Sequence, residues 1–141
     1  MTSPLYSLDV LRLAAGTGDF PRLSNAQATV ERLSRTCGSR ITVDISLDDE
    51  GRVVCYGHEV RACAVGQAAA TLVARHAAGQ SVADLVALAD GMRSFISGEH
   101  DALPTIAGFD ALIPIRGYPA RHEAALMAID AAVAAATEAA A

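Results

Sequence analysis

The sequence predicts an α+β fold built on a small antiparallel sheet. Residues 40–48 alternate apolar and polar side chains with the period of a half-buried strand. A turn at residues 48–51 and a second run of β-forming residues at 52–59 extend this strand into a hairpin. After Val60 the composition shifts to alanine and to helix start and stop signals. The sheet is therefore expected to pack against helices that follow it in the chain.

The first elements follow from local signals. Ser7 is expected to cap a short helix that ends at Gly16. The turn-forming residues 18–21 then lead into a loop. Residues 29–34 are a candidate third strand, which a hairpin needs in order to be stable in water. Together these signals predict a three-stranded antiparallel sheet preceded by a short helix.

Helices are predicted for most of the second half of the chain. Residues 63–78 form one, and a capping box at residues 81–84 starts the next. Residues 98–119 hold three prolines, so a loop with one helical turn around residues 109–112 is expected. From Ala120 to the end alanine predominates, which predicts a helix with one mildly apolar face. That face carries Leu126, Met127, Ile129 and Val133.

Length and charge narrow the class of protein. The 141 residues are enough to bury a core without disulfides, so one domain over residues 1–141 is expected. With 16 acidic against 11 basic side chains the net charge is -5, which argues against nucleic acid as a partner. No apolar run approaches the roughly 20 residues that cross a bilayer, and the first residues lack a secretory signal. These features predict a cytoplasmic protein that does not bind membranes.

Two cysteines are the main candidates for chemistry. Cys37 and Cys63 flank the predicted hairpin, so they are expected to come close in space. Gly38 lets another group approach Cys37, and the helix start at Cys63 favours a thiolate. Three cysteines in a reducing compartment indicate metal or redox chemistry more than a disulfide framework. A buried apolar role is the favoured interpretation for Cys55 and an equal alternative for the other two.

His122 and Glu123 are further candidate ligands. They lie at the predicted start of the last helix, just after a turn that contains proline, where functional groups often occur. A solvated helix start is the simpler alternative. No Gly-rich phosphate loop and no local enzyme signature surrounds either thiol, so catalysis is not predicted.

The order of these elements and the segments around the thiols resemble the NifU-like N-terminal family. This family contains the scaffold proteins of iron-sulfur cluster assembly, among them IscU and SufU. The resemblance covers most of the chain. It rests on four segments in family order, namely Leu5-Tyr6, Cys37-Gly38, Ala62-Cys63-Ala64 and Arg116-Gly117-Tyr118-Pro119-Ala120-Arg121.

The resemblance implies an α+β fold in which helices cover the sheet, and it implies a ligand cluster at one end. In the family three cysteines and an aspartate hold a transient iron-sulfur cluster or zinc, and a cysteine desulfurase supplies sulfur. Thiolate suits both cargoes. Here Ser39 replaces the aspartate and the third cysteine is missing. Aligned to the family without a gap, this sequence has Ala124 at the position of the third cysteine. A shift of one residue, which matches His122 to the histidine that precedes this cysteine in the family, places Glu123 at the position instead.

The sequence therefore predicts a non-enzymatic scaffold or carrier that binds iron, a nascent cluster or zinc through Cys37 and Cys63. Glu123 and His122 are additional metal ligands in this prediction, and without them a homodimer or a partner protein has to complete the site. The expected partners are a cysteine desulfurase and acceptor apoproteins. One alternative is a SufU-like, zinc-dependent sulfur acceptor, and another is a metal-free interaction module.

Overall fold

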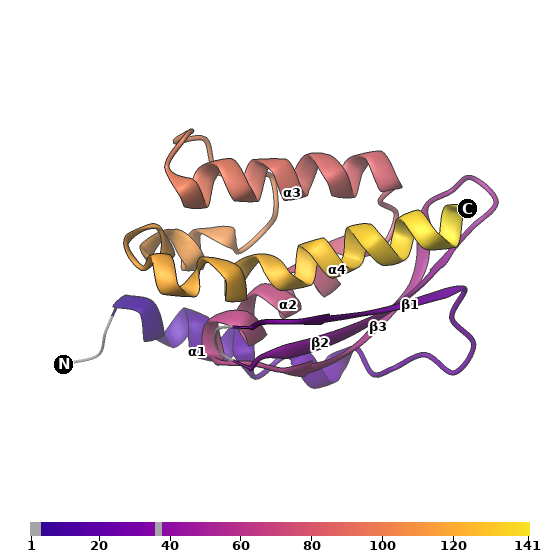
Figure 1. Ribbon diagram of the computed structural model, residues 1–141, viewed down its shortest axis with the longest axis horizontal. Coiled ribbons are helices and arrows are strands. Elements are labelled where there is room, and N and C mark those ends of the chain that lie inside the picture. Colours follow the sequence, from indigo (N-terminus) through magenta and orange to yellow (C-terminus); the bar gives the residue numbers. More distant parts are fainter. Residues whose placement is uncertain (1–3, 36–37) are drawn as a thin grey trace.

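The computed structural model describes residues 4–35 and 38–141 (Figure 1). The three strands form one antiparallel sheet in the order β1-β2-β3, as the sequence predicts. Gly51 adopts a φ of +79° in the turn between β2 and β3, which favours glycine at this position. The elements are η1 (Pro4–Tyr6), α1 (Leu8–Ala14), η2 (Thr17–Asp19), β1 (Ala28–Leu33), β2 (Arg40–Leu47), β3 (Val53–Arg61), α2 (Ala64–Ala77), α3 (Val82–Ser97), η3 (Phe109–Gly117), η4 (Pro119–Arg121) and α4 (His122–Ala140).

The predicted helix caps are confirmed. The Ser7 hydroxyl accepts a hydrogen bond of 3.2 Å from the amide of Val10 at the start of α1. Ser81 and Asp84 form a reciprocal capping box at the start of α3. α3 ends at Gly98, which has the left-handed conformation typical of a C-terminal cap. Local sequence signals are sufficient to define these boundaries.

The prediction that β2 is only half-buried is wrong. Its polar residues Thr42 and Asp44 are 7% and 0% exposed, although they alternate with apolar core residues. The loop that leads into β1 covers the outer face of the sheet, and the backbone oxygen of Pro21 lies so close to Gly57 that a side chain there would collide with it. Polar alternation in β2 therefore reflects a buried polar network and not a solvated face.

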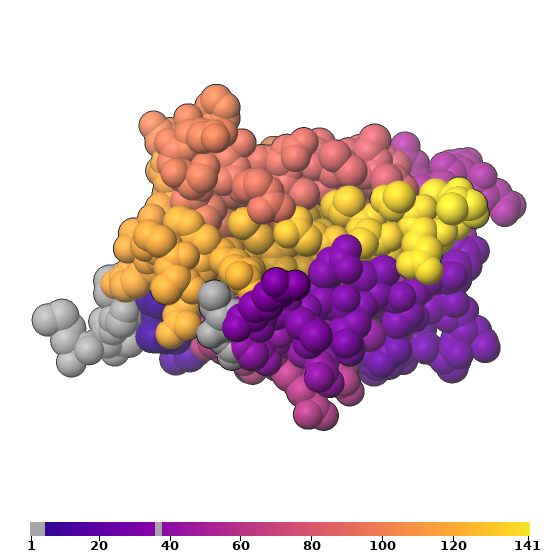
Figure 2. All heavy atoms as spheres, in the orientation of Figure 1, coloured from indigo at the N-terminus to yellow at the C-terminus, as the bar shows by residue number. Residues whose placement is uncertain are grey.

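The alanine-rich helix α4 is packed on several sides, and only part of it is exposed, including Glu123, Thr137 and Glu138. It packs against the sheet strands β1 and β2 on one side and against α2 and α3 on others. Figures 1 and 2 show α4, in yellow, between the purple sheet and α3. The prediction of a single mildly apolar face is therefore too narrow, because small alanine side chains let neighbouring elements approach from several directions. Its buried residues are Ala124, Ala125, Leu126, Met127, Ala128, Ile129, Ala131, Ala132, Ala135 and Ala136.

The segment before α4 is more ordered than the sequence predicts. A 3-10 helix, η3, covers Phe109–Gly117 where only one turn is expected. It buries Phe109, Leu112 and Ile115, and this burial stabilises a helix that contains Pro114.

Within the described residues, no helix has both the length and the apolar character that a membrane span requires.

Candidate thiol site

Cys63 lies where the sheet passes into helix α2. It is the N-cap residue of α2 and follows Arg61, the last residue of β3, by two positions. The amide of Gln67 donates to the Cys63 carbonyl at 2.9 Å, and the Gln67 side chain donates to the Ala62 carbonyl at 2.9 Å. The cysteine side chain makes no capping hydrogen bond and is only partly buried. The backbone around Cys63 is thus fixed, and its partly buried side chain packs against the core without a capping hydrogen bond.

The register of the sheet brings the connection between β1 and β2 to the same end as Cys63. Arg40 at the start of β2 pairs with Leu33 of β1 and with Arg61 of β3. Gly38, which follows Cys37 in the chain, donates its amide to the Ser34 carbonyl at 3.1 Å. Cys37 itself lies outside the described residues. Its meeting with Cys63 stays a prediction, although its described neighbours lie at the required end of the sheet.

The two candidates for the third ligand position lie on different faces of α4. Ala124 is 3% exposed and faces α2, because a β-carbon added to Gly66 would lie 3.8 Å from the β-carbon of Ala124. Gly66 follows Cys63 by three residues, so Ala124 lies beside the first turn of the helix that Cys63 caps. Glu123 is exposed and lines a hollow of about 300 Å³ with Arg32 and with Leu33, Arg93, Leu126, Met127 and Asp130. This geometry favours the ungapped match.

His122 is engaged by the backbone. Its Nε2 donates to the Ile115 carbonyl at 2.9 Å, which leaves Nδ1 as the nitrogen with a free lone pair. Among residues 4–35 and 38–141, no group of three or more histidine, cysteine or acidic side chains is arranged to hold a metal ion. The described residues therefore do not form a complete metal site, and the roles of His122 and Glu123 as ligands stay predictions.

Arginines surround this end of the molecule, a feature that the overall charge of -5 conceals. We call them the basic rim and define it as Arg32, Arg35, Arg40, Arg61 and Arg121. Four of them are exposed and Arg121 is partly buried. Among the described residues, only Arg40 of this set has an ion pair, with Glu31 at 3.8 Å. The register of the strands places Arg32, Arg40 and Arg61 at this end, and Arg35 follows β1 in the chain. Arg121 directly precedes α4, whose Ala124 packs beside the start of α2.

Asp44 anchors the loop that covers the outer face of the sheet. Its carboxylate accepts hydrogen bonds from Arg22 Nε at 2.7 Å, from the Thr29 hydroxyl at 2.6 Å and from the Leu23 amide at 2.9 Å. Burial alone raises the pKa of Asp44, but the hydrogen bonds and the Arg22 charge outweigh it and hold the pKa below its usual value. Asp44 is therefore a charged structural residue and not a metal ligand.

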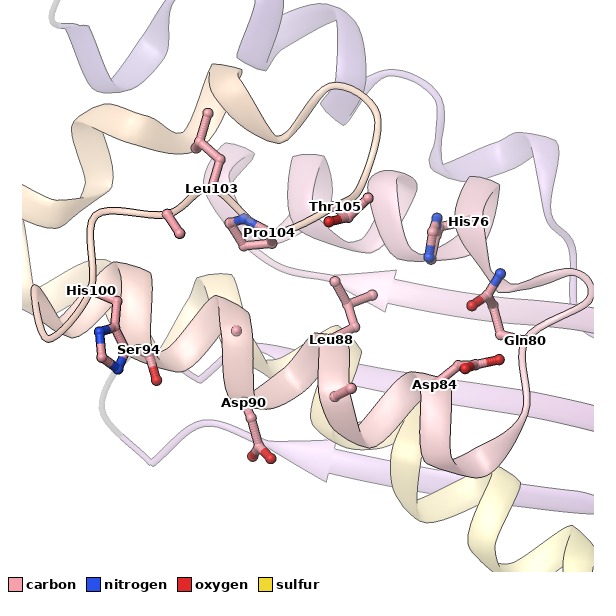
Figure 3. A pocket seen from close by; sticks show the side chains of 13 residues that line it. His76, Gln80, Asp84, Leu88, Asp90, Ser94, His100, Leu103, Pro104 and Thr105 are labelled. Carbon is pink, nitrogen blue, oxygen red and sulfur yellow. The ribbon is translucent and has the colours of Figure 1, made fainter.

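A larger hollow of about 620 Å³ lies elsewhere, between α3, the end of α2 and the segment that follows α3 (Figure 3). Leu88 and Gly91 of α3, Leu103 and Pro104 line it together with His76 and His100. Cys63 does not line this hollow. The described part of the candidate thiol site therefore lies apart from this hollow.

The fold and the thiol position define a class: α+β proteins with a three-stranded antiparallel sheet, covering helices, and a cysteine at the junction of β3 and α2. No protein-family model and no curated protein matches the sequence. The crystal structure of a nitrogen-fixing NifU-like protein (N-terminal) from Brucella abortus is similar, with 30% identity and a TM-score of 0.89 over 96% of this chain and 94% of that chain. The chain therefore belongs to the NifU-like N-terminal family.

A second similar structure comes from Fervidobacterium islandicum AW-1. That protein, FiSufU, is described as an iron-sulfur cluster assembly scaffold for the SUF system. It is 18% identical, with a TM-score of 0.78 over 94% of this chain and 96% of that chain, and at this identity it shows the fold alone.

Proposed function

We propose that this protein is a scaffold or carrier in cytoplasmic iron-sulfur cluster assembly, in which Cys37 and Cys63 bind the iron, nascent cluster or zinc that it carries. The observation that supports this function best is the position of Cys63. Cys63 is partly buried against the core, its side chain makes no capping hydrogen bond, and the backbone at Ala62 and Cys63 accepts two hydrogen bonds from Gln67. Such a thiol is able to receive a ligand without unfolding the helix.

The donor set fits this cargo only in part. An iron-sulfur cluster takes four protein ligands and zinc takes three or four, whereas the predicted set offers two thiols. Ala124 contributes no donor atom, and Ser39 replaces the carboxylate of the family. Glu123 and His122 are the predicted additional ligands, and where neither binds the metal, a second copy of the chain or a partner protein supplies the missing donors. Incomplete ligation within one chain suits a carrier, because a cargo that is held by few ligands leaves more easily.

Anaerobic reconstitution tests this function. Reduced protein is incubated with ferrous iron and sulfide, or with zinc, and bound metal is counted after gel filtration. The proposal predicts metal in a fixed ratio to protein, lost in Cys37→Ser and in Cys63→Ser and retained in Cys55→Ser. Cys55 is exposed on β3, opposite Ser46, so the buried role that the sequence favours for it is wrong, and it serves as the matched control.

The same experiment separates the candidate functions. A visible cluster absorption supports the scaffold. A colourless zinc protein that stimulates a cysteine desulfurase supports a sulfur acceptor instead. No stoichiometric metal in any of these preparations contradicts both functions and supports an interaction module without metal.

A further inference from the structure

The basic rim has a charge pattern that the fold alone does not require. Arg40 and Arg61 are directly opposite each other in the last row of the sheet. Like charges in this arrangement destabilise a pair of strands. Both side chains are exposed, and Glu31 offsets only Arg40, at 3.8 Å. A local cost of this kind next to Cys63 indicates a role in recognition.

The charge at the other end of the sheet has the opposite sign. The turn between β2 and β3 carries Asp48, Asp49 and Glu50, all exposed. An acidic molecule that is basic around its thiol has an uneven electrostatic field, and such a field orients charged partners during approach. The end that carries Cys63 therefore attracts negative charge even though the whole protein repels it.

We propose that the basic rim selects partners that present an acidic surface around the group that reacts with Cys63. This inference rests on the proposed function, in which a partner protein exchanges sulfur or cargo with the thiols. Arginine suits this role because its planar, always charged group binds carboxylates through paired hydrogen bonds. The exposed side chain of Leu33, in the same row as Arg40 and Arg61, adds an apolar contact to the surface.

Thiol–disulfide exchange measures this selection without a known partner. The probe is a short peptide whose single cysteine is joined to 2-thiopyridine by a disulfide. The Cys63 thiolate attacks the sulfur of the peptide cysteine, a new disulfide forms between Cys63 and the peptide, and the pyridine thiolate leaves and takes up a proton. One peptide carries glutamates on both sides of the cysteine, and a second of equal length carries lysines.

The experiment uses the full chain with Cys37→Ser and Cys55→Ser, so that Cys63 is the only thiol. We expect the glutamate peptide to react roughly tenfold faster than the lysine peptide at low salt. The ratio of the two rates is expected to approach one at high salt, because ions screen exposed charges. Arg61→Gln combined with Arg121→Gln is expected to lower the ratio. Arg52→Gln combined with Arg75→Gln, which makes the same charge change far from Cys63, is the matched control and is expected to preserve it.

Equal rates for both peptides at low salt, or a faster lysine peptide, would overturn the inference. An equal loss of selectivity in the rim variant and in the control variant would also contradict it, because the effect would then reflect net charge only. The readout does not involve metal. Selectivity without metal binding therefore contradicts the proposed function alone, whereas metal binding without selectivity contradicts the rim inference alone.

Discussion

Ala124 of α4 packs against Gly66 of α2. Gly66 lies about one helical turn after Cys63 in the chain. A β-carbon at position 66 would lie 3.6 Å from the Ala124 carbonyl oxygen and 3.8 Å from its β-carbon. The neighbouring Glu123 points to a different side of α4 and lines a hollow with Arg32. Position 124 therefore lies beside the first turn of α2, and we expect a third ligand to reach the thiol site from there.

Ala124→Cys is therefore expected to complete a three-thiol site. With a third thiolate, zinc affinity should rise at least tenfold over the unmodified protein, measured by competition with a chromophoric chelator. Glu123→Cys is the matched control and should change the affinity little. A larger gain for Glu123→Cys than for Ala124→Cys would refute this placement of the third ligand.

Gly66→Ala tests the close packing at the start of α2. The added β-carbon would approach the Ala62 β-carbon to 2.8 Å, so the start of α2 has to shift. We expect a loss of about 1–3 kcal/mol in the free energy of unfolding, measured by urea denaturation. Gly91→Ala in α3 is the control, since nothing lies within 4 Å of a β-carbon there, and it should stabilise the helix slightly. Equal stability of the two variants would contradict the close packing at Gly66.

Asp44→Asn is expected to loosen the loop over the sheet. The amide keeps the shape but loses the charge that Arg22, Thr29 and Leu23 stabilise, at a cost of about 2 kcal/mol. Because folding lowers the Asp44 pKa, the carboxylate stabilises the protein at pH values above its ordinary pKa of 3.8. This contribution disappears as the pH falls through the pKa that Asp44 has in the folded state. The difference between wild type and variant should therefore shrink in acid. Asp49→Asn is the control, and an equal effect there would contradict this role of Asp44.

His58 makes stability depend on pH near neutrality. It is 4% exposed, its Nε2 donates to the Thr17 carbonyl at 2.9 Å, and its Nδ1 has no hydrogen-bond partner among the described residues. Burial lowers the pKa of His58, and the bond to Thr17 opposes this only in part. The unfolded chain therefore takes up the proton first, and stability should fall as the pH drops below 6.5.

His58→Phe provides the check on this pH dependence. The ring should keep the edge contacts that His58 makes with Phe20 and Tyr56. Urea denaturation at several pH values between 7.5 and 5.5 is expected to show a flatter profile for His58→Phe than for wild type. His76→Gln on α2 serves as the control and should retain the wild-type slope. An unchanged slope in His58→Phe would show that another group is responsible.

Features that depend on neighbouring residues in the chain could be predicted from the sequence. The strand β2, the cap at Ser7 and the capping box at Ser81 all follow from local rules, and the structure contains each of them. The N-cap position of Cys63 belongs to the same group, because the change from strand to alanine-rich helix is visible in the sequence.

Features that depend on distant contacts could not be predicted in this way. Asp44 looks like a solvated strand residue until Arg22 and Thr29 are placed around it. The burial of α4 on several sides depends on which elements surround it and not on its alanine pattern. The register of β2 with β3 likewise reveals that Arg40 and Arg61 are opposite each other. These contacts join residues that are well separated in the sequence.

X-ray absorption spectroscopy at the metal edge tests the central claim, that Cys37 and Cys63 bind the cargo. The protein is loaded with zinc anaerobically, and the spectra of wild type, Cys37→Ser, Cys63→Ser and Cys55→Ser are compared. The account predicts sulfur neighbours at about 2.3 Å from zinc in wild type and in Cys55→Ser. It predicts fewer sulfur neighbours in Cys37→Ser and in Cys63→Ser. A wild-type spectrum with only nitrogen and oxygen neighbours, or one that neither substitution changes, would contradict it.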